Sequence, residues 1–320
     1  MIPVFLHTFQ PSPIMLSFGP INIYWYGFFI VLGVISALLI AMKLGSYYGI
    51  KKETVIDLAF YLVIFGVIGA RVYDVFFVEW SYFSGHLLDI FKVWQGGLAI
   101  HGAVIAGVIT LYFFAKKTNP LNLPAQAGPP LKGGQENAAH LQKGGEGGYF
   151  WLLASILVPG LALAQAIGRW GNYFNQELFG GPTGLPWGIP ISIVNRPIEY
   201  LSSTHFHPAF LYESLGNLLI FVILIIFHVL MIRNKIPSAS FSSRDGLTPF
   251  WKGGKLNRYA LCVMSYAISY SILRFFTEFI RIDPTPEILG LRLPQIVSLL
   301  VVIFSVIFLI LKAKKAKTAD

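Results

Sequence analysis

The sequence predicts an all-α integral membrane protein with about seven transmembrane helices, and three observations support this prediction. The 320-residue chain is 55% hydrophobic and only 12% charged, whereas an average soluble domain is about 25% charged. Its apolar runs are continuous and do not alternate with polar residues, which favours helices over the strands of a membrane barrel. Seven of these runs are long enough to cross a hydrocarbon core of about 30 Å.

The expected spans follow one another along the whole chain and make up a single polytopic domain. Their approximate bounds are 21–42, 55–78, 98–115, 149–167, 209–232, 259–280 and 294–311. Two segments, 119–148 and 235–255, have few large apolar residues and are expected to be flexible cytoplasmic loops. The sequence shows no internal repeat, which disfavours the inverted-repeat folds of transporters.

The positions of lysine and arginine predict the orientation of the chain. Seventeen of the 24 basic residues fall in the C-terminal tail and in alternate loops, and five fall on the opposite side. The positive-inside rule therefore places the N-terminus outside, the C-terminus in the cytoplasm and the 168–207 region, with a small lobe, at the outer face. The net charge of +9 then follows from topology, so nucleic acid is not an expected partner.

The densest group of polar residues is the segment Gly168–Gly180, which follows the apolar end of the fourth span. It contains Arg169, Asn172, Asn175 and Glu177, which are costly to hold in water-poor surroundings without partners. An ordinary polar helix end is one interpretation. The favoured interpretation is a site for an anionic headgroup, because the planar fork of arginine suits phosphate.

Three further spans carry polar residues near their expected outer ends. Tyr26 lies just inside an aromatic belt, and His101 lies near glycines, either as a packing residue or as a neutral imidazole base. Tyr270, Arg274 and Glu278 are spaced four apart and share one helical face. Arg274 is therefore either neutralised by Glu278 or a second cation for a phosphate.

Other polar residues have simpler interpretations. Glu213, near the start of the fifth span, either pairs with Arg169 or Arg274 or stabilises its helix start. Arg71 and Asp74 lie one turn apart inside the second span and are expected to form a structural ion pair. All the candidate site residues belong to one leaflet or its surface, which suggests a lipid substrate with a phosphate in its headgroup.

Five motifs together resemble the bacterial prolipoprotein diacylglyceryl transferases. They are the Gly168–Gly180 segment, Gly96-Gly97 with His101-Gly102, Trp25-Tyr26-Gly27, His207-Pro208 with Tyr212-Glu213, and Tyr270 with Arg274 and Glu278. The resemblance implies that the diacylglyceryl group of phosphatidylglycerol is transferred to the lipobox cysteine thiol of a preprolipoprotein. A thioether forms and glycerol 1-phosphate leaves, as the first step of lipoprotein maturation in the bacterial cytoplasmic (inner) membrane, with the site toward the outer leaflet.

The resemblance also implies roles for single residues. The candidate catalytic residues are His101, Arg169, Arg274 and Tyr26. The candidate residues for headgroup binding and site shaping are Arg169, Asn172, Asn175, Glu177, Gly180, Tyr270, Arg274 and Glu278.

The chemistry of this reaction agrees with the composition of the chain. The nucleophile belongs to the substrate, so the enzyme needs no cysteine of its own, and Cys262 is the only one. Neither a metal nor an organic cofactor is expected. The expected partners are phosphatidylglycerol, lipobox peptides and the lipid bilayer. The competing interpretations are a lipid or solute transporter and another outer-leaflet phospholipid transferase.

Overall fold

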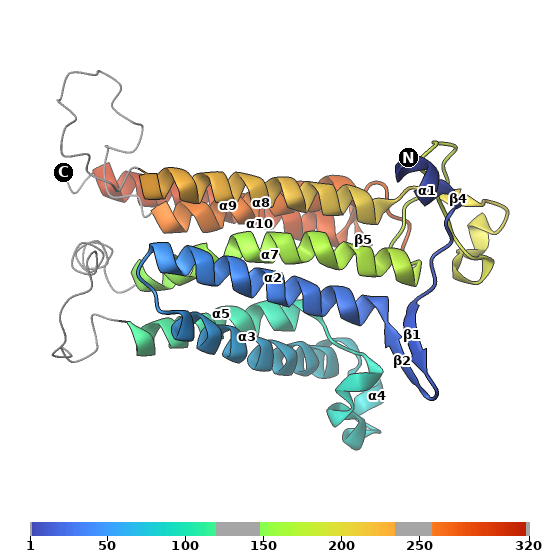
Figure 1. The fold of residues 1–320 in the computed structure, drawn as a ribbon, viewed down its shortest axis with the longest axis horizontal. Coiled ribbons are helices and arrows are strands. Elements are labelled where there is room, and N and C mark those ends of the chain that lie inside the picture. The colour runs from blue at the N-terminus through green and yellow to red at the C-terminus, as the bar shows by residue number, and fades with distance from the viewer. Residues whose placement is uncertain (1, 120–147, 234–257, 318–320) are drawn as a thin grey trace. The chain divides into compact units, whose positions relative to one another are not determined.

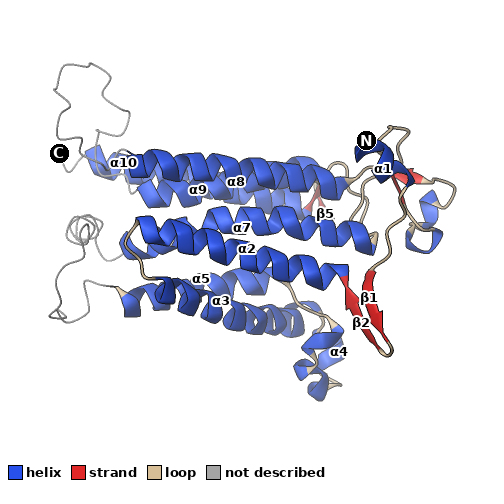
Figure 2. Cartoon of the chain, in the orientation of Figure 1, coloured by secondary structure: helices blue, strands red, loops and turns tan. Residues whose placement is uncertain are grey.

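The structure is a computed structural model that describes residues 2–119, 148–233 and 258–317. Helices dominate it, together with three short antiparallel strand pairs, β1–β2, β3–β4 and β5–β6 (Figures 1 and 2). The chain divides into two compact units, Met1–Ile40 with Leu157–Asp320, and Ala41–Ile156. Apart from residues 119 and 148, the predicted flexible segments 119–148 and 235–255 lie outside the described residues. The prediction of a single polytopic domain stays a prediction.

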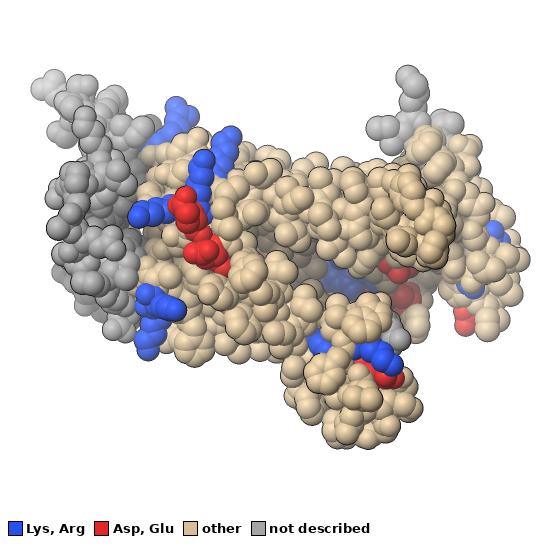
Figure 3. Space-filling model, turned by 60° about the horizontal axis from the view of Figure 1, so that its bottom comes forward, with Lys and Arg blue, Asp and Glu red and all other residues tan. Residues whose placement is uncertain are grey.

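Within the described residues, seven helices are long and apolar enough to cross a membrane, which confirms the expected fold class. They are α2 (Trp25–Tyr47), α3 (Lys52–Tyr73) with the π-helical turn Asp74–Val78, α5 (Ile100–Thr118), α7 (Gly148–Asn175), α8 (Ala209–Arg233), α9 (Arg258–Thr277) and α10 (Leu293–Lys317). On the face drawn in Figure 3, Lys and Arg side chains gather near helix ends and uncharged residues cover most of the helix middles. This distribution suits helices that face hydrocarbon.

Most helix boundaries differ from the expected ones by a few residues, and two of the differences are informative. The first span begins at Trp25, because Ile21–Tyr24 forms strand β2 and pairs with β1 (Ile14–Phe18) across a turn at Gly19. The fourth span does not end at 167, since α7 continues to Asn175. The expectation that the Gly168–Gly180 segment follows this helix is therefore wrong for its first eight residues. The extended part of α7 packs on α2: a Cβ on Gly171 would lie 2.8 Å from Cδ2 of Tyr26, so this close approach requires glycine.

In the unit formed by residues 1–40 and 157–320, helices α7, α8, α9 and α10 run alongside one another (Figure 1). The first part of α2 packs closely on α7, because a Cβ on Gly160 would lie 2.7 Å from the carbonyl oxygen of Ala37. Val158, Ala162 and Cys262 belong to the buried core between these helices. The interpretation of Cys262 as a small buried hydrophobe is confirmed.

A small lobe lies beyond the end of α7 in the same unit. It contains α1 (Ile2–Thr8), β3 (Ile189–Pro190) and β4 (His205–Phe206), with β3 and β4 paired. Leu6 from α1 shares a buried core with Phe179 and Phe206. The lobe agrees with the predicted one around 168–207, but the sequence did not indicate that α1 completes its core.

In the unit Ala41–Ile156, α3 and α5 are in close contact. A Cβ on Gly102 would lie 2.1 Å from the carbonyl oxygen of Gly69, so only glycine permits this approach. Between the two helices the chain forms α4 (Trp80–Phe83) and two 3₁₀ turns, Leu87–Phe91 and Val93–Gln95.

Arg71 fixes the connection between α3 and α5. Its guanidinium donates hydrogen bonds of 2.6 to 2.9 Å to the backbone oxygens of Asp89, Ile90, Gly96 and Gly97. The Arg71–Asp74 ion pair is confirmed, with 3.7 Å between Nη1 and Oδ2. The carbonyl groups are nevertheless the closer partners, so Arg71 mainly satisfies the backbone of a loop.

Candidate active site

The last two turns of α7 begin the candidate site. Arg169 and Asn172 lie three residues apart on this helix, and Arg169 Nη1 donates to Asn172 Oδ1 at 3.3 Å. Asn172 Nδ2 in turn donates to Glu177 Oε1 at 2.7 Å, and Asn175 Nδ2 donates to the same oxygen at 3.4 Å. The polar residues of the Gly168–Gly180 segment therefore satisfy one another, with the guanidinium at one end of the chain of hydrogen bonds.

A left-handed turn brings Glu177 back toward the helix. Gln176 and Leu178 have φ angles of 52° and 55°, a conformation that is unfavourable for residues other than glycine. The side chain of Gln176 holds the turn by donating to the backbone oxygen of Pro11 at 2.7 Å and accepting from the Ser192 N–H at 2.6 Å. Gln176, whose side chain connects α7 to Pro11 and Ser192, was not among the residues that the sequence indicated for the site.

Glu213 on α8 lies at the centre of the site. Its carboxylate is 2.5 Å from Arg169 Nε, 3.2 Å from Arg274 Nη1 and 3.4 Å from Arg281 Nη1. The Glu213 side chain is only 4% exposed, so its charge depends on these arginines. The expectation that Glu213 pairs with Arg169 or Arg274 is confirmed for both, and Arg281 is a third partner.

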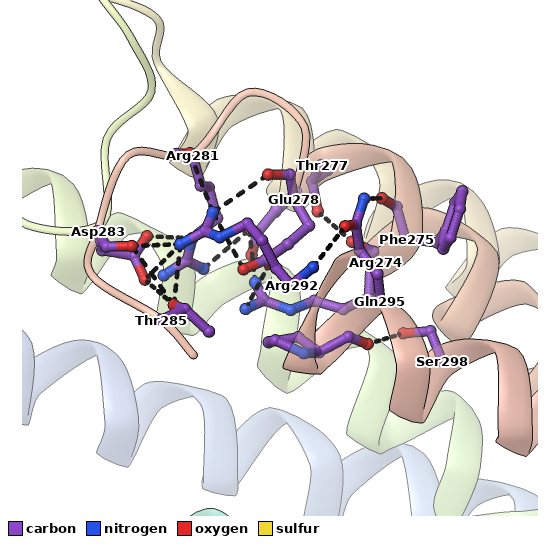
Figure 4. Close-up of polar contacts among 12 residues, drawn as sticks. Arg274, Phe275, Thr277, Glu278, Arg281, Asp283, Thr285, Arg292, Gln295 and Ser298 are labelled. Carbon is purple, nitrogen blue, oxygen red and sulfur yellow. Dashed lines mark hydrogen bonds and ion pairs between the residues drawn. The ribbon is translucent and has the colours of Figure 1, made fainter. Parts of the chain in front are cut away.

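A second buried carboxylate extends the network. The Glu278 side chain is 0% exposed, and its Oε2 lies 2.8 Å from Arg274 Nη2, which confirms the expected pair. Its other oxygen lies 3.1 Å from Arg292 Nη1. Figure 4 shows Arg281 and Arg292 converging on Asp283 beside this pair.

Arg281, Asp283 and Arg292 were not among the residues that the sequence indicated for the site. Arg281 lies three residues after Glu278, a helical spacing that was available as a signal. Arg292 precedes α10 and reaches the site only because α9 and α10 pack together. No local pattern in the sequence predicts the contact of Arg292 with the site.

The charges of this network are nearly balanced. Four arginines face three carboxylates, Glu213, Glu278 and Asp283. Burial alone would lower the pKa of Arg281, but its hydrogen bond to Asp283 and the nearby carboxylates outweigh burial and raise it. Burial alone would raise the pKa of Asp283, but Arg281 and Arg292 hold it below its usual range.

Arg169 and Arg274 differ from the other arginines in their exposure. Each side chain is 19% exposed, whereas that of Arg281 is 4% exposed. Both are held by the same buried carboxylate of Glu213, so two guanidinium groups are fixed in one place while part of each remains accessible. Such a pair is suited to binding an oxyanion with several acceptor oxygens.

Gly180 lies where three segments of the chain meet. Its N–H donates to the backbone oxygen of His207 at 2.9 Å. A Cβ at this position would lie 2.5 Å from Cγ2 of Ile280 and 2.7 Å from Cβ of His207. The packing therefore requires glycine at this position. This structural requirement is separate from the role in shaping the site that is predicted for Gly180.

The other predicted residues lie around this network or outside its unit. Tyr26 is exposed and packs on Gly171 of α7. Tyr270 stacks on Tyr266, with ring centroids 6.0 Å apart, one turn before Arg274 on α9. His101 is the second residue of α5 in the unit Ala41–Ile156, exposed, with its ring 5.6 Å from that of Tyr73.

The structure thus brings together Arg169, Asn172, Asn175, Glu177, Arg274 and Glu278 through their own contacts and through Glu213. The roles predicted for these residues, and for Tyr26, His101, Gly180 and Tyr270, stay predictions. Within the described ranges, no cluster of three or more His, Cys, Asp or Glu side chains is arranged to hold a metal ion.

Comparison with known proteins gives a consistent result. Residues 13–135 and 140–311 match the family described as prolipoprotein diacylglyceryl transferase. Among similar proteins, the phosphatidylglycerol–prolipoprotein diacylglyceryl transferase of Synechocystis sp. is 38% identical over 304 residues, 94% of this chain and 89% of the relative. The proteins of the same name from Synechococcus elongatus and a Nostoc species are 36% and 37% identical, over 94% and 92% of this chain and 87% of each relative.

Proposed function

The chain belongs to the prolipoprotein diacylglyceryl transferase family, and from this premise we propose that it transfers the diacylglyceryl group of phosphatidylglycerol to the lipobox cysteine of a preprolipoprotein. The main structural support for this proposal is the pair of arginines Arg169 and Arg274. Both are held by the buried carboxylate of Glu213, and both remain partly exposed. This arrangement suits the phosphate of the headgroup.

The reaction requires one bond to form and one to break. The cysteine sulfur attacks the carbon of the diacylglyceryl group that is bonded to the phosphate oxygen. A carbon–sulfur bond forms, the carbon–oxygen bond breaks, and glycerol 1-phosphate leaves with the bonding electrons. Negative charge grows on the phosphate as it leaves, so two fixed guanidinium groups stabilise the transition state more than the substrate.

The thiol must lose its proton before or during the attack, because the thiolate is the reactive species. We assign this step to His101, whose exposed ring lies at the start of α5, because histidine is the side chain that most often acts as a general base. Tyr26, on α2 beside Gly171, is assigned to the headgroup together with Asn172 and Glu177.

The protein is a multi-pass membrane protein, as its seven apolar helices and its family indicate. We place it in the bacterial cytoplasmic membrane with the site toward the outer leaflet. The support for this orientation is the excess of basic residues in the alternate loops and tail that do not carry the site. The small lobe then lies outside the membrane, near the bilayer surface where a lipobox peptide arrives.

A transfer assay with purified protein in detergent tests the proposal. The mixture contains phosphatidylglycerol and a peptide with a lipobox cysteine, and the control peptide carries serine in place of that cysteine. The expected result is a mass gain of one diacylglyceryl group on the cysteine peptide alone, with release of glycerol phosphate. Labelling of the serine peptide would indicate another transferase. Absence of any product from folded, lipid-bound protein would overturn the proposal and favour transport.

A further inference from the structure

Arg292 is the most extensively engaged of the arginines that the sequence did not indicate. Its guanidinium donates hydrogen bonds to the backbone oxygens of Glu278 (3.1 Å), Arg281 (2.9 Å) and Asp283, and to Oγ1 of Thr285 (2.8 Å). It also forms ion pairs with the carboxylates of Glu278 and Asp283, at 3.1 and 3.5 Å. Figure 4 shows how these contacts surround it.

These contacts exclude Arg292 from direct catalysis. Its side chain is 12% exposed, and both of its terminal nitrogens already bind groups of the chain. Little donor capacity is left for a substrate. Any effect of Arg292 on the reaction must therefore act through a neighbour.

Glu278 is that neighbour. Its side chain is fully buried, and neither carboxylate oxygen has a hydrogen bond of good geometry among the described residues. Its charge is balanced by two ion pairs, with Arg274 on one oxygen and Arg292 on the other. A buried carboxylate that is shared in this way divides its attraction between its two partners.

We propose that Arg292 is a positioning residue that, by sharing the charge of Glu278, keeps Arg274 available to the phosphate of the lipid headgroup. This inference rests on the proposed function, because it takes the headgroup phosphate as the ligand of Arg274. The headgroup must compete for Arg274 with two carboxylates, Glu213 and Glu278. Without Arg292, Arg274 is the one ion-pair partner left to Glu278 among the described residues, so the competition shifts against the phosphate.

The first variant is Arg292→Gln. We expect the KM for phosphatidylglycerol and the Ki for glycerol 1-phosphate both to rise about tenfold, a typical effect between residues coupled in one ion-pair network. The KM for the lipobox peptide should stay unchanged, because the peptide does not compete with Glu278.

The matched control is Arg196→Gln. Arg196 also holds a loop through backbone oxygens, those of Ile191 and Leu201, at 2.8 and 3.0 Å. Among the described residues it pairs with no carboxylate. Its loss should leave the Ki for glycerol 1-phosphate within about twofold of the wild-type value, since only loop packing is affected.

A double-mutant cycle with Glu278→Gln separates positioning from a purely structural role. If Arg292 acts by balancing Glu278, then adding Arg292→Gln to Glu278→Gln should change the Ki by no more than about twofold. If Arg292 only holds the 278–285 turn, the substitution should weaken phosphate binding as much in that background as in the wild type. That result would overturn the proposal.

Two further variants distinguish a loss of folding from a loss of phosphate binding. If Arg292→Gln alone does not fold, the double variant still gives the test against Glu278→Gln, because it buries no unpaired charge. Arg292→Lys keeps the charge near Glu278 but cannot make every contact of the fork. We expect it to lower the thermal stability while leaving the Ki within about threefold of wild type, and a Ki as high as that of Arg292→Gln would contradict the inference.

The test also distinguishes the inference from the proposed function. The Kd for glycerol 1-phosphate is measured as a thermal shift of the full-length protein in detergent; it requires no transfer and can replace the Ki in the cycle. A wild-type protein that binds glycerol 1-phosphate but transfers nothing would refute the proposed function and leave the cycle interpretable. A protein that transfers normally, with additive effects in the cycle, would refute only the role of Arg292.

Discussion

Replacing Glu213 with glutamine tests the central assumption that one buried carboxylate holds two phosphate-binding arginines. Glu213 contacts Arg169, Arg274 and Arg281 at 2.5, 3.2 and 3.4 Å. Glutamine keeps the shape and one acceptor oxygen but removes the charge. The excess of arginine over carboxylate in the network then rises from one to two.

The loss of stability in Glu213→Gln depends on which carboxylate partners each arginine retains. Arg274 keeps Glu278, and Arg281 keeps Asp283 at 2.7 Å. Arg169 keeps no carboxylate among the described residues. Breaking a buried pair costs about 3–5 kcal/mol, and since Arg169 is partly exposed we expect the lower end, about 3 kcal/mol. For a 320-residue chain, whose unfolding entropy is about 0.7 kcal/mol/K, that corresponds to a fall in Tm of roughly 4–5 °C.

The assay is thermal unfolding in detergent, with and without glycerol 1-phosphate. The ligand should raise the Tm of Glu213→Gln more than that of the wild type, because its phosphate replaces the missing negative charge. Asp89→Asn is the control: Asp89 pairs with Lys92 at 2.6 Å on the surface, where an ion pair contributes little. A Glu213→Gln protein with an unchanged Tm, or with a smaller response to the ligand than the wild type, would refute the reasoning.

Three further predictions concern single residues. Arg274→Lys should lower kcat/KM for phosphatidylglycerol about tenfold or more, because a point charge does not reproduce a planar fork; activity near wild type in the transfer assay would contradict this. Gly180→Ala should not fold stably, since its Cβ would lie 2.5 Å from Cγ2 of Ile280. Gly181→Ala should be tolerated, because its Cβ would lie 3.8 Å from the nearest atom, Cγ2 of Ile282. Equal yields and Tm values for the two variants would show that the packing around Gly180 is not tight. Burial alone would raise the pKa of Asp283, but the hydrogen bond and charge of Arg281 outweigh burial and lower it. Asp283 should therefore contribute stability above its unfolded pKa of about 3.9, and this stability should be lost as the pH falls through the lower folded pKa. Asp283→Asn should therefore flatten the acid end of the Tm–pH profile, and a parallel profile would argue against the pair.

Much of the fold could be predicted because each membrane span carries its own signal. A run of about twenty apolar residues indicates a helix regardless of its neighbours. The exceptions are the places where tertiary packing decides. Helix α7 continues past 167 and packs there on Tyr26 through Gly171. Leu6 of α1 belongs to the core of a lobe formed mainly by residues far along the chain.

The candidate site was predictable to the extent that its contacts are local. Arg274 and Glu278 are four residues apart, so helical geometry alone brings them together. Arg169 and Glu213 were indicated because a charge in an apolar environment needs a partner. Arg292 was missed because its contacts depend on how the connection between α9 and α10 folds back on residues 278–285. The pattern of a single segment does not contain that information.

The burial of Cys262 has a consequence for an enzyme that alkylates sulfur. The side chain is fully buried between helices, with Sγ 3.6 Å from Nε2 of His228. An accessible thiol near the lipid would compete with the incoming peptide and would end in irreversible self-modification. The chain keeps its single thiol buried, so a thiol-reactive dye added to the native protein should count unreacted peptide and not enzyme.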